Sequence, residues 1–225
     1  MEAAVVTLIF SPRWFYGIDS LFDIVFVLVS ILIAAFARKA FRLTRERKFL
    51  SLYWAFVFFA LAFLVKILTH VVIYFKYMDL NVLNLFLALG EITLGFQIGY
   101  FLYRLVFLLS LIILLSLTMH ITDKRILVML QIFAVLFAAT SMAWPVVFHI
   151  VGAVFLFFIC NTCRMNYKFR GTMPSKLVAY SFLMFFLSQV MFILMSWHDF
   201  AYVLGETMQL IGSLLLLASL YLVLR

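Results

Sequence analysis

Charged residues are scarce in this chain, and that scarcity excludes a soluble globular domain. Lys, Arg, Asp and Glu make up 12% of the 225 residues, whereas 68% of the residues are hydrophobic. Soluble domains contain about 25% charged and 45–50% apolar residues. Since a soluble fold cannot bury so much apolar surface, we expect an integral protein of the cell membrane, surrounded by the lipid bilayer.

Catalytic and cofactor motifs are also absent from the sequence. There is no GxSxG, Walker or HExxH pattern and no evident pair of catalytic carboxylates, and the last apolar segment lacks a lysine that could bind retinal. His70, His149 and His198 lack the HxxxH spacing of a helical zinc site. Cys160 and Cys163 are too few for a disulfide framework. We therefore predict that the protein is not an enzyme and uses no catalytic residue, metal or cofactor.

Long apolar segments fill almost the entire chain. A helix of about 20 apolar residues crosses the hydrocarbon layer, and seven such spans would use nearly the whole sequence. We predict an all-α, polytopic membrane protein, a seven-transmembrane helix bundle in which residues 1–225 form one domain. The more polar residues 76–94 are expected to form an outer loop with a short interfacial helix. The predicted spans are approximately 18–37, 49–75, 95–118, 126–141, 146–163, 177–197 and 200–224.

Two local signals indicate helix ends. Asp19 or Ser20 is expected to cap the first span, because a short polar side chain can accept hydrogen bonds from free backbone N–H groups. Pro145 lies between the fourth and fifth spans, where a proline ends one helix and can start the next. The alternative is a single fused helix in this region, which would leave six spans.

The basic residues indicate the topology. Lys and Arg concentrate in loops on the cytoplasmic side of membrane proteins, and here they concentrate in every second connection. Seven spans place these connections on one side, with the N-terminus outside and the C-terminus cytoplasmic, whereas six spans would put 164–176 outside. The net charge of +8 thus reflects topology and attraction to anionic lipid, and we expect no nucleic-acid partner. The residues concerned are Arg38, Lys39, Arg42, Arg45, Arg47, Lys48, Lys124, Arg125, Arg164, Lys168, Arg170, Lys176 and Arg225.

Ionisable residues inside the spans all fall in the outer half of the predicted bundle. A charge within the bilayer is costly, so such residues face other helices or water and mark candidate sites. Gln97, Tyr100 and Arg104 follow i, i+3, i+7 spacing, and Glu206 and Gln209 lie on one face of the last span. We predict an outward-open polar pocket. Its expected lining is Asp23, Lys66, His70, Arg104 and Glu206, with Glu91 above it and Gln97, Tyr100 and Gln209 on the same polar stripes.

The alternative is a set of structural ion pairs without a ligand, and helix direction bears on this choice. Side chains tilt toward the N-terminus of their helix. Asp23, Arg104 and Glu206 can therefore lean toward the outer interface or pair between helices. Lys66 lies on a helix that runs outward, so its side chain starts toward the bilayer centre and we expect a buried partner such as Asp23 or Glu206.

Residues 202–225, YVLGETMQLIGSLLLLASLYLVLR, together with the overall layout, resemble a known class of membrane modules. These are the seven-helix, N-out sensor regions at the front of prokaryotic histidine kinases, and stand-alone archaeal membrane proteins of similar length. The resemblance implies an outer pocket that senses a ligand, and an output through a separate partner.

Three functions remain open at this point. The first is a receptor-like or sensor-like module that binds a small anionic or zwitterionic molecule around Lys66 and Arg104 and signals through a membrane or cytoplasmic partner. The second is an accessory or assembly subunit of a larger membrane complex or oligomer, which the GxxxG spacing of Gly95 and Gly99 would suit. The third is a small-solute transporter.

Overall fold

The chain is α-helical throughout the part that the structure describes. The computed structural model describes residues 13–15, 17–78, 85–195 and 198–224, with side chains for 14–15, 17–71, 95–195, 198 and 200–223. No strand occurs in these ranges, in agreement with the predicted all-α class. A 3-10 turn, η1, precedes seven helices: η1 Arg13–Phe15, α2 Ile18–Thr44, α3 Arg47–Met78, α4 Leu85–Thr118, α5 Lys124–Ala143, α6 Pro145–Arg170, α7 Met173–Leu194 and α8 Asp199–Leu224.

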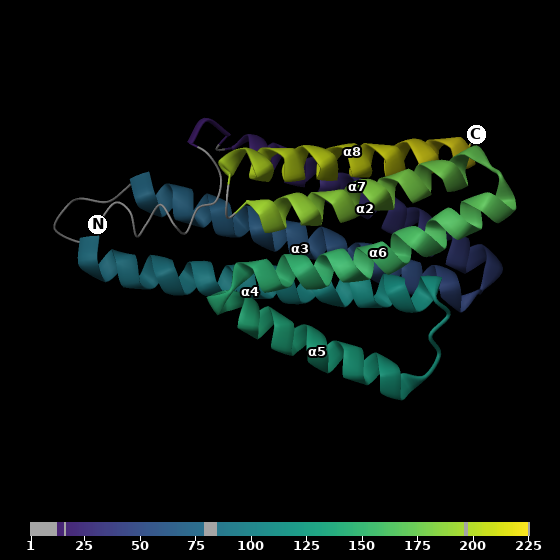
Figure 1. The fold of residues 1–225 in the computed structure, drawn as a ribbon, viewed down its shortest axis with the longest axis horizontal. Coiled ribbons are helices and arrows are strands. Elements are labelled where there is room, and N and C mark those ends of the chain that lie inside the picture. Colours follow the sequence, from purple (N-terminus) through teal and green to yellow (C-terminus); the bar gives the residue numbers. More distant parts are fainter. Residues whose placement is uncertain (1–12, 16, 79–84, 196–197, 225) are drawn as a thin grey trace.

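The helices run alternately up and down the long axis of one bundle (Figure 1). The α2–α3, α4–α5 and α6–α7 turns and the end of α8 meet at one end of the bundle. The extensive contacts join α2 with α3, α3 with α4, α6 with α7 and α7 with α8, while α2 also contacts α8. Helix α5 contacts α4 and α6 and lies at the edge of the bundle.

In the described residues, seven helices are long and apolar enough to cross a membrane, as the sequence predicts. Several continue beyond the predicted spans, because a helix hydrogen-bonds its own backbone and need not end at the edge of the apolar segment. Helix α2 thus runs to Thr44 instead of residue 37. The predicted outer loop over 76–94 differs most from the structure, since α3 extends to Met78 and α4 begins at Leu85; residues 79–84 lie outside the described ranges.

Pro145 separates the fourth and fifth membrane helices, as predicted. Helix α5 ends at Ala143 and Pro145 occupies the first turn of α6. Proline suits this position because its missing N–H would have no partner in the first turn of a helix. The fused helix of the six-span alternative is therefore excluded.

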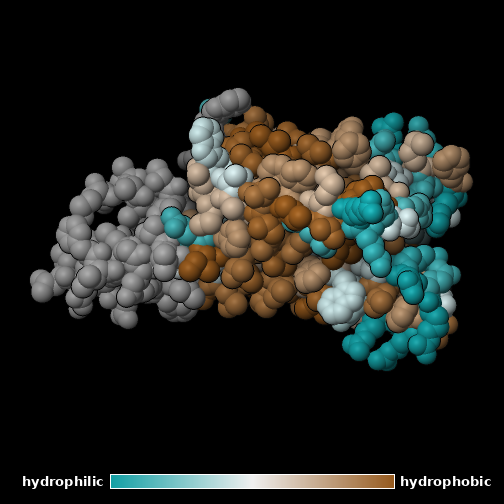
Figure 2. Space-filling view, turned by 90° about the horizontal axis from the view of Figure 1, so that it is seen from below, coloured by the Kyte–Doolittle hydropathy of each residue, from teal (hydrophilic) through white to brown (hydrophobic). Residues whose placement is uncertain are grey.

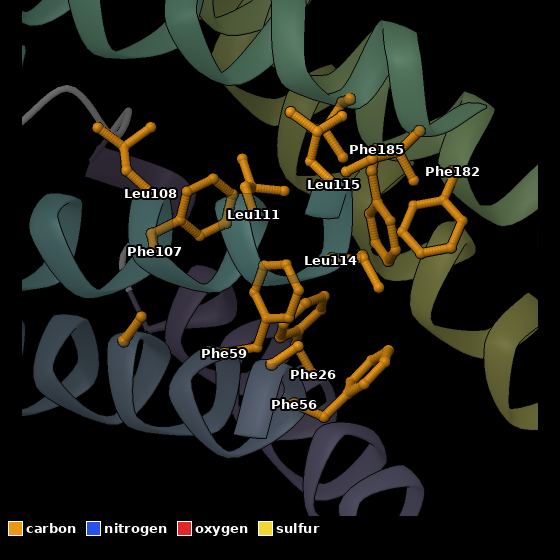
Figure 3. Close-up of a cluster of buried hydrophobic side chains, with 14 of the residues drawn as sticks. Phe26, Phe56, Phe59, Phe107, Leu108, Leu111, Leu114, Leu115, Phe182 and Phe185 are labelled. Carbon is orange, nitrogen blue, oxygen red and sulfur yellow. The ribbon is translucent and has the colours of Figure 1, made fainter. Parts of the chain in front are cut away.

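Aromatic and aliphatic side chains fill the centre of the bundle (Figure 3). Phe26 of α2 lies 4.2 Å from the ring of Phe63 and 5.5 Å from that of Phe185, measured between ring centroids. Phe107 of α4 packs edge-on against Phe59 at 5.5 Å. Such contacts hold α2, α3, α4 and α7 around one apolar core and fix the relative positions of the polar residues nearby.

One end of the bundle is hydrophilic, and Figure 2 shows it beyond an apolar mid-section. The basic residues at the α2–α3, α4–α5 and α6–α7 turns are exposed, apart from the half-buried Lys176. The two acids at these turns have local partners: Glu46 pairs with Lys48, and Asp123 caps α5 by accepting from the backbone N–H of Arg125 at 2.8 Å. This end therefore carries a large excess of positive charge.

Candidate functional site

The charged residues of three helices meet in one buried cluster, here called the triad: Asp23, Lys66 and Glu206. Nζ of Lys66 in α3 lies 3.0 Å from Oδ1 of Asp23 in α2 and 2.9 Å from Oε1 of Glu206 in α8. The three residues are 6%, 0% and 1% exposed, in the order Lys66, Asp23, Glu206. The prediction that Lys66 has a buried carboxylate partner is confirmed, and Lys66 has two.

Helix position and direction explain how the triad forms. Asp23 lies in the second turn of α2 and Glu206 in the first turns of α8. Lys66 lies in the later half of the antiparallel α3, and side chains tilt toward the N-terminus of their helix. Asp23 and Glu206 therefore lean toward the end where α2 and α8 begin, while Lys66 leans the opposite way, toward the core. Aromatic rings line its path, with Nζ 5.6 Å from the ring centroid of Phe63 and 6.0 Å from that of Tyr103.

Within the triad, hydrogen-bonding capacity is only partly used. Oδ2 of Asp23 and Oε2 of Glu206 are buried and have no hydrogen-bond partner among the described residues. Fully ionised, the triad would carry two negative charges and one positive charge. This leaves an excess of one negative charge. An unbalanced charge in a buried site costs several kcal/mol, so the excess must be balanced.

Asp19 forms a second polar group one turn before Asp23. Its Oδ1 accepts from the backbone N–H groups of Ser20 at 2.7 Å and Gly17 at 3.1 Å, and its Oδ2 accepts from Oη of Tyr202 at 3.4 Å. The predicted cap was Asp19 or Ser20, but the N-cap residue is Gly17, so that assignment was wrong. Gly17 has a φ of 85°, a conformation that glycine adopts without strain, and this places Asp19 inside the first turn, facing α8.

His70 connects this group to α4. Its Nε2 lies 2.5 Å from Oη of Tyr100, and its Nδ1 lies 4.0 Å from Oδ2 of Asp19. The side chain is 20% exposed, in contrast to the buried triad. His70 and Tyr100, two of the predicted lining residues, are thus in contact at the more accessible side of the cluster, and a pocket around them stays a prediction.

Arg104 hydrogen-bonds to α5 and to no member of the triad among the described contacts. One guanidinium nitrogen, Nη1, donates to the backbone carbonyl of Ser141 in α5 at 2.5 Å, with Oγ of the same residue at 3.3 Å. The guanidinium carbon lies 5.5 Å from the ring centroid of Tyr100 and 5.8 Å from that of Phe148. Arg104 thus leans toward the end of the bundle where α5 ends, but it is buried and forms no ion pair with an acid among the described residues. The carbonyl of Ser141 is its acceptor.

The remaining predicted lining residues are placed as follows. Gln97 is exposed and Gln209 is buried, with 6% of its surface exposed. Glu91 lies in α4, but its side chain falls outside the described residues. Gln97 lies about two turns before Arg104 on the same side of α4, but its side chain is exposed, so it does not extend the buried polar group.

The other histidine inside the bundle joins two helices. Nδ1 of His149 in α6 lies 2.9 Å from Oε1 of Gln189 in α7. Among the described residues, no group of three or more His, Cys, Asp or Glu side chains is arranged to hold a metal ion. The contact with Gln189 thus gives His149 a structural role as a link between α6 and α7.

Sequence reasoning missed several of these partners. Tyr202 lies one turn before Glu206 and Asp19 one turn before Asp23, so the i, i+4 spacing on both helices could have indicated a longer polar face. Ser141 had no such signal, because the acceptor that matters is its backbone carbonyl, which every residue has. Gln189 is the one amide side chain of α7, which could have marked it as an inter-helix contact.

Comparisons of the chain with protein-family models, curated proteins and solved structures return no match. The site must therefore be interpreted from its own geometry.

Proposed function

We propose that this chain is a receptor-like or sensor-like seven-helix membrane module in which the triad couples the two ends of the bundle. The observation that carries the proposal is the position of the triad. Lys66 binds carboxylates of the first and last membrane helices at once, and both helices extend from there to the basic end. A change at the triad would alter how α8 lies against α2 and α3.

The surroundings of the triad support an input at that end. His70, which is partly exposed, connects to Asp19 and Tyr100, and Asp19 connects to Tyr202 of α8. A polar ligand that reaches His70 would therefore disturb a set of contacts shared by α2, α3, α4 and α8. Arg104 has guanidinium N–H groups beyond the one that bonds Ser141. It forms no ion pair among the described residues, so an anionic or zwitterionic ligand could bind this cation inside the bundle.

The basic end is proposed to be cytoplasmic, which puts the N-terminus outside and the triad in the outer half. The exposed Lys and Arg residues at three helix connections support this orientation. Single cysteines at Arg45 and Trp144, two exposed positions at opposite ends, would test it in intact cells with a membrane-impermeant maleimide. Labelling at position 144 and protection at 45 are expected, and the reverse pattern would refute the orientation.

A distance measurement tests the coupling itself. Leu43 of α2 and Tyr221 of α8 are 77% and 64% exposed near the basic end, so spin labels there report how the two helices separate. Cys160 and Cys163 are first replaced by Ser and Ala. Glu206→Gln is expected to shift the inter-label distance distribution, because it removes a charged tie of α8. Glu46→Gln, which changes an exposed acid at the basic end, is the control. Identical distance distributions for the parent protein, Glu206→Gln and Glu46→Gln would contradict the proposal.

A second function, an accessory subunit of a larger membrane complex, is favoured by α5. All residues of α5 are described, and its buried side chains are Ala134, Ala138 and Ser141. Large apolar side chains such as Ile132 and Phe133 face outward, which suits either lipid or a partner helix. Native mass spectrometry from the source membrane separates the two: a stoichiometric partner protein supports the subunit role, and a lone monomer contradicts it.

A further inference from the structure

We propose that the triad is a proton-binding site, in which one proton is held by the carboxyl groups of Asp23 and Glu206 while Lys66 remains charged. The proposal concerns the ligand of the triad and does not depend on whether the protein signals. It rests on three structural features: the sharing of one ammonium by two carboxylates, the lack of a partner for one oxygen on each, and the burial of all three side chains.

The two carboxylates share a single counter-charge. Both bonded oxygens lie about 3 Å from Nζ of Lys66, so they are within about 6 Å of each other, a range in which like charges strongly disfavour joint ionisation. With Lys66 charged, one ionised carboxylate gives a neutral cluster and two give a net negative charge. A single proton removes the excess.

The free oxygens provide the place for that proton. Oδ2 of Asp23 and Oε2 of Glu206 are buried and unpartnered among the described residues. A protonated carboxyl group keeps its other oxygen as an acceptor for Lys66, so proton binding at either free oxygen preserves both contacts to Nζ. The proton thus adds to the observed geometry without breaking any of its hydrogen bonds.

Neighbouring charges do not supply an alternative balance. On α2, Asp19 adds a negative charge, although backbone N–H groups and Tyr202 of α8 bond it. On α3, His70 lies 4.0 Å from Asp19 and its other nitrogen contacts Tyr100 of α4.

The remaining neighbours come from α4, α6 and α7. Tyr103 of α4 faces Lys66 with its ring, and Arg104 of α4 is engaged by Ser141. His149 of α6 is bonded to Gln189 of α7. No further cation among the described residues forms an ion pair with Asp23 or Glu206.

Proton binding would make the packing of α8 sensitive to pH. Helices α3 and α8 share little backbone contact in the described part of the chain, so the Lys66–Glu206 pair is a main connection between them. Loss of the proton would leave a net negative charge buried among α2, α3 and α8, which weakens the folded state. In its protonated form, the folded state holds one more proton than the unfolded chain. The stability of the fold therefore falls as pH rises, and the unfolding equilibrium constant increases up to about tenfold per pH unit.

Infrared spectroscopy of the full chain tests the site directly. The protein is studied in dodecyl maltoside, a detergent without carbonyl groups, and the carbonyl stretch of a protonated carboxylic acid is followed between about pH 5 and pH 9. We expect one such band in the wild type at the lower end, and its loss at higher pH. Glu46→Gln, which removes an exposed acid, is expected to keep the band.

Three variants make the test specific. Asp23→Asn and Glu206→Gln each leave one carboxylate opposite Lys66, a neutral pair that needs no proton, so each is expected to lose the band. Lys66→Met removes the counter-charge, so the band should grow, since both carboxyls then need protons. If one variant fails to fold, the others and isotope labelling of the wild type with ¹³C-Asp or ¹³C-Glu give the same answer. Absence of the band from the wild type throughout the range, or its persistence in both amide variants, would overturn the proposal.

Discussion

Lys66 and Glu206 lie 140 residues apart in the chain, yet Nζ of the one is 2.9 Å from Oε1 of the other, in a site from which water is almost excluded. This contact joins the second and last membrane helices. Because Asp23 of the first membrane helix binds the same nitrogen, one side chain of α3 contacts both the first and the last membrane helix.

Replacement of Lys66 by Met should destabilise the protein strongly. The change leaves two buried carboxylates without their counter-charge, and removal of one partner of a buried ion pair costs about 3–5 kcal/mol. Thermal unfolding in detergent measures the loss. Lys39→Met is the matched control, since Lys39 is exposed at the basic end and surface changes stay within about 0.5 kcal/mol. Equal unfolding temperatures for the two variants would show that the pair contributes nothing.

Simultaneous replacement of all three charges should be less harmful than loss of Lys66 alone. In Asp23→Leu, Lys66→Met, Glu206→Met, no buried charge remains, and apolar substitutes for buried ion pairs are often neutral or stabilising by about 1–4 kcal/mol. The triple variant should therefore unfold at a higher temperature than Lys66→Met. A lower unfolding temperature would mean that shape, and not charge balance, dominates the site.

Gly99 should not tolerate a methyl group, whereas Gly95 should. A Cβ at Gly99 would overlap the Thr69 side chain of α3, while a Cβ at Gly95 meets no atom of the described residues within 4 Å. Gly99→Ala is thus expected to cost about 1–3 kcal/mol, the range for overpacking, and Gly95→Ala close to nothing. Thr69→Ala should restore stability to Gly99→Ala in the double variant. Equal effects at the two glycines would contradict a close α3–α4 approach at Gly99.

Loss of the Arg104 guanidinium should loosen α5. Its hydrogen bond to the Ser141 carbonyl ties α5 to α4, and a hydrogen bond to a charged group contributes about 1.5–3 kcal/mol. Arg104→Gln should therefore speed amide hydrogen exchange over Lys124–Ala143. Ser141→Ala keeps the carbonyl and should leave exchange unchanged. Unchanged exchange in Arg104→Gln would contradict this role, and equally faster exchange in both variants would assign the contact to the hydroxyl of Ser141 instead.

The sequence was sufficient for the seven spans because apolar length and the placement of Lys and Arg act along the chain, one segment at a time. Pro145 is a similar local signal. The partner of Lys66 could also be predicted, since helix direction pointed its side chain away from the interface. Arg104 could not be placed, because its acceptor is a backbone carbonyl on another helix. The place of Asp19 inside the first turn of α2 could not be predicted either, because the left-handed conformation of Gly17, which fixes where α2 begins, leaves no mark in the hydrophobic pattern.

The ligand-binding role of the predicted lining residues stays a prediction. The structure brings Asp23, Lys66 and Glu206 together and places His70 beside Tyr100, whereas Gln97 is exposed. Lys66 is bonded to two carboxylates, and the His70 side chain is 20% exposed whereas Lys66 is 6% exposed, so a ligand would meet His70 before it met Lys66. Spacing along single helices could not reveal that two carboxylates occupy Lys66, because this contact depends on how α2, α3 and α8 meet.

Magic-angle-spinning NMR of the protein in lipid bilayers tests the triad most directly. In a sample with ¹⁵N-labelled lysine and ¹³C-labelled aspartate and glutamate, the Nζ of Lys66 should show through-space correlations to two side-chain carboxyl carbons. The correlation to Asp23 should vanish in Asp23→Asn prepared without ¹³C-asparagine, and that to Glu206 should vanish in Glu206→Gln prepared without ¹³C-glutamine. A Lys66 signal that correlates with water or lipid, and with neither carboxyl carbon, would contradict the account.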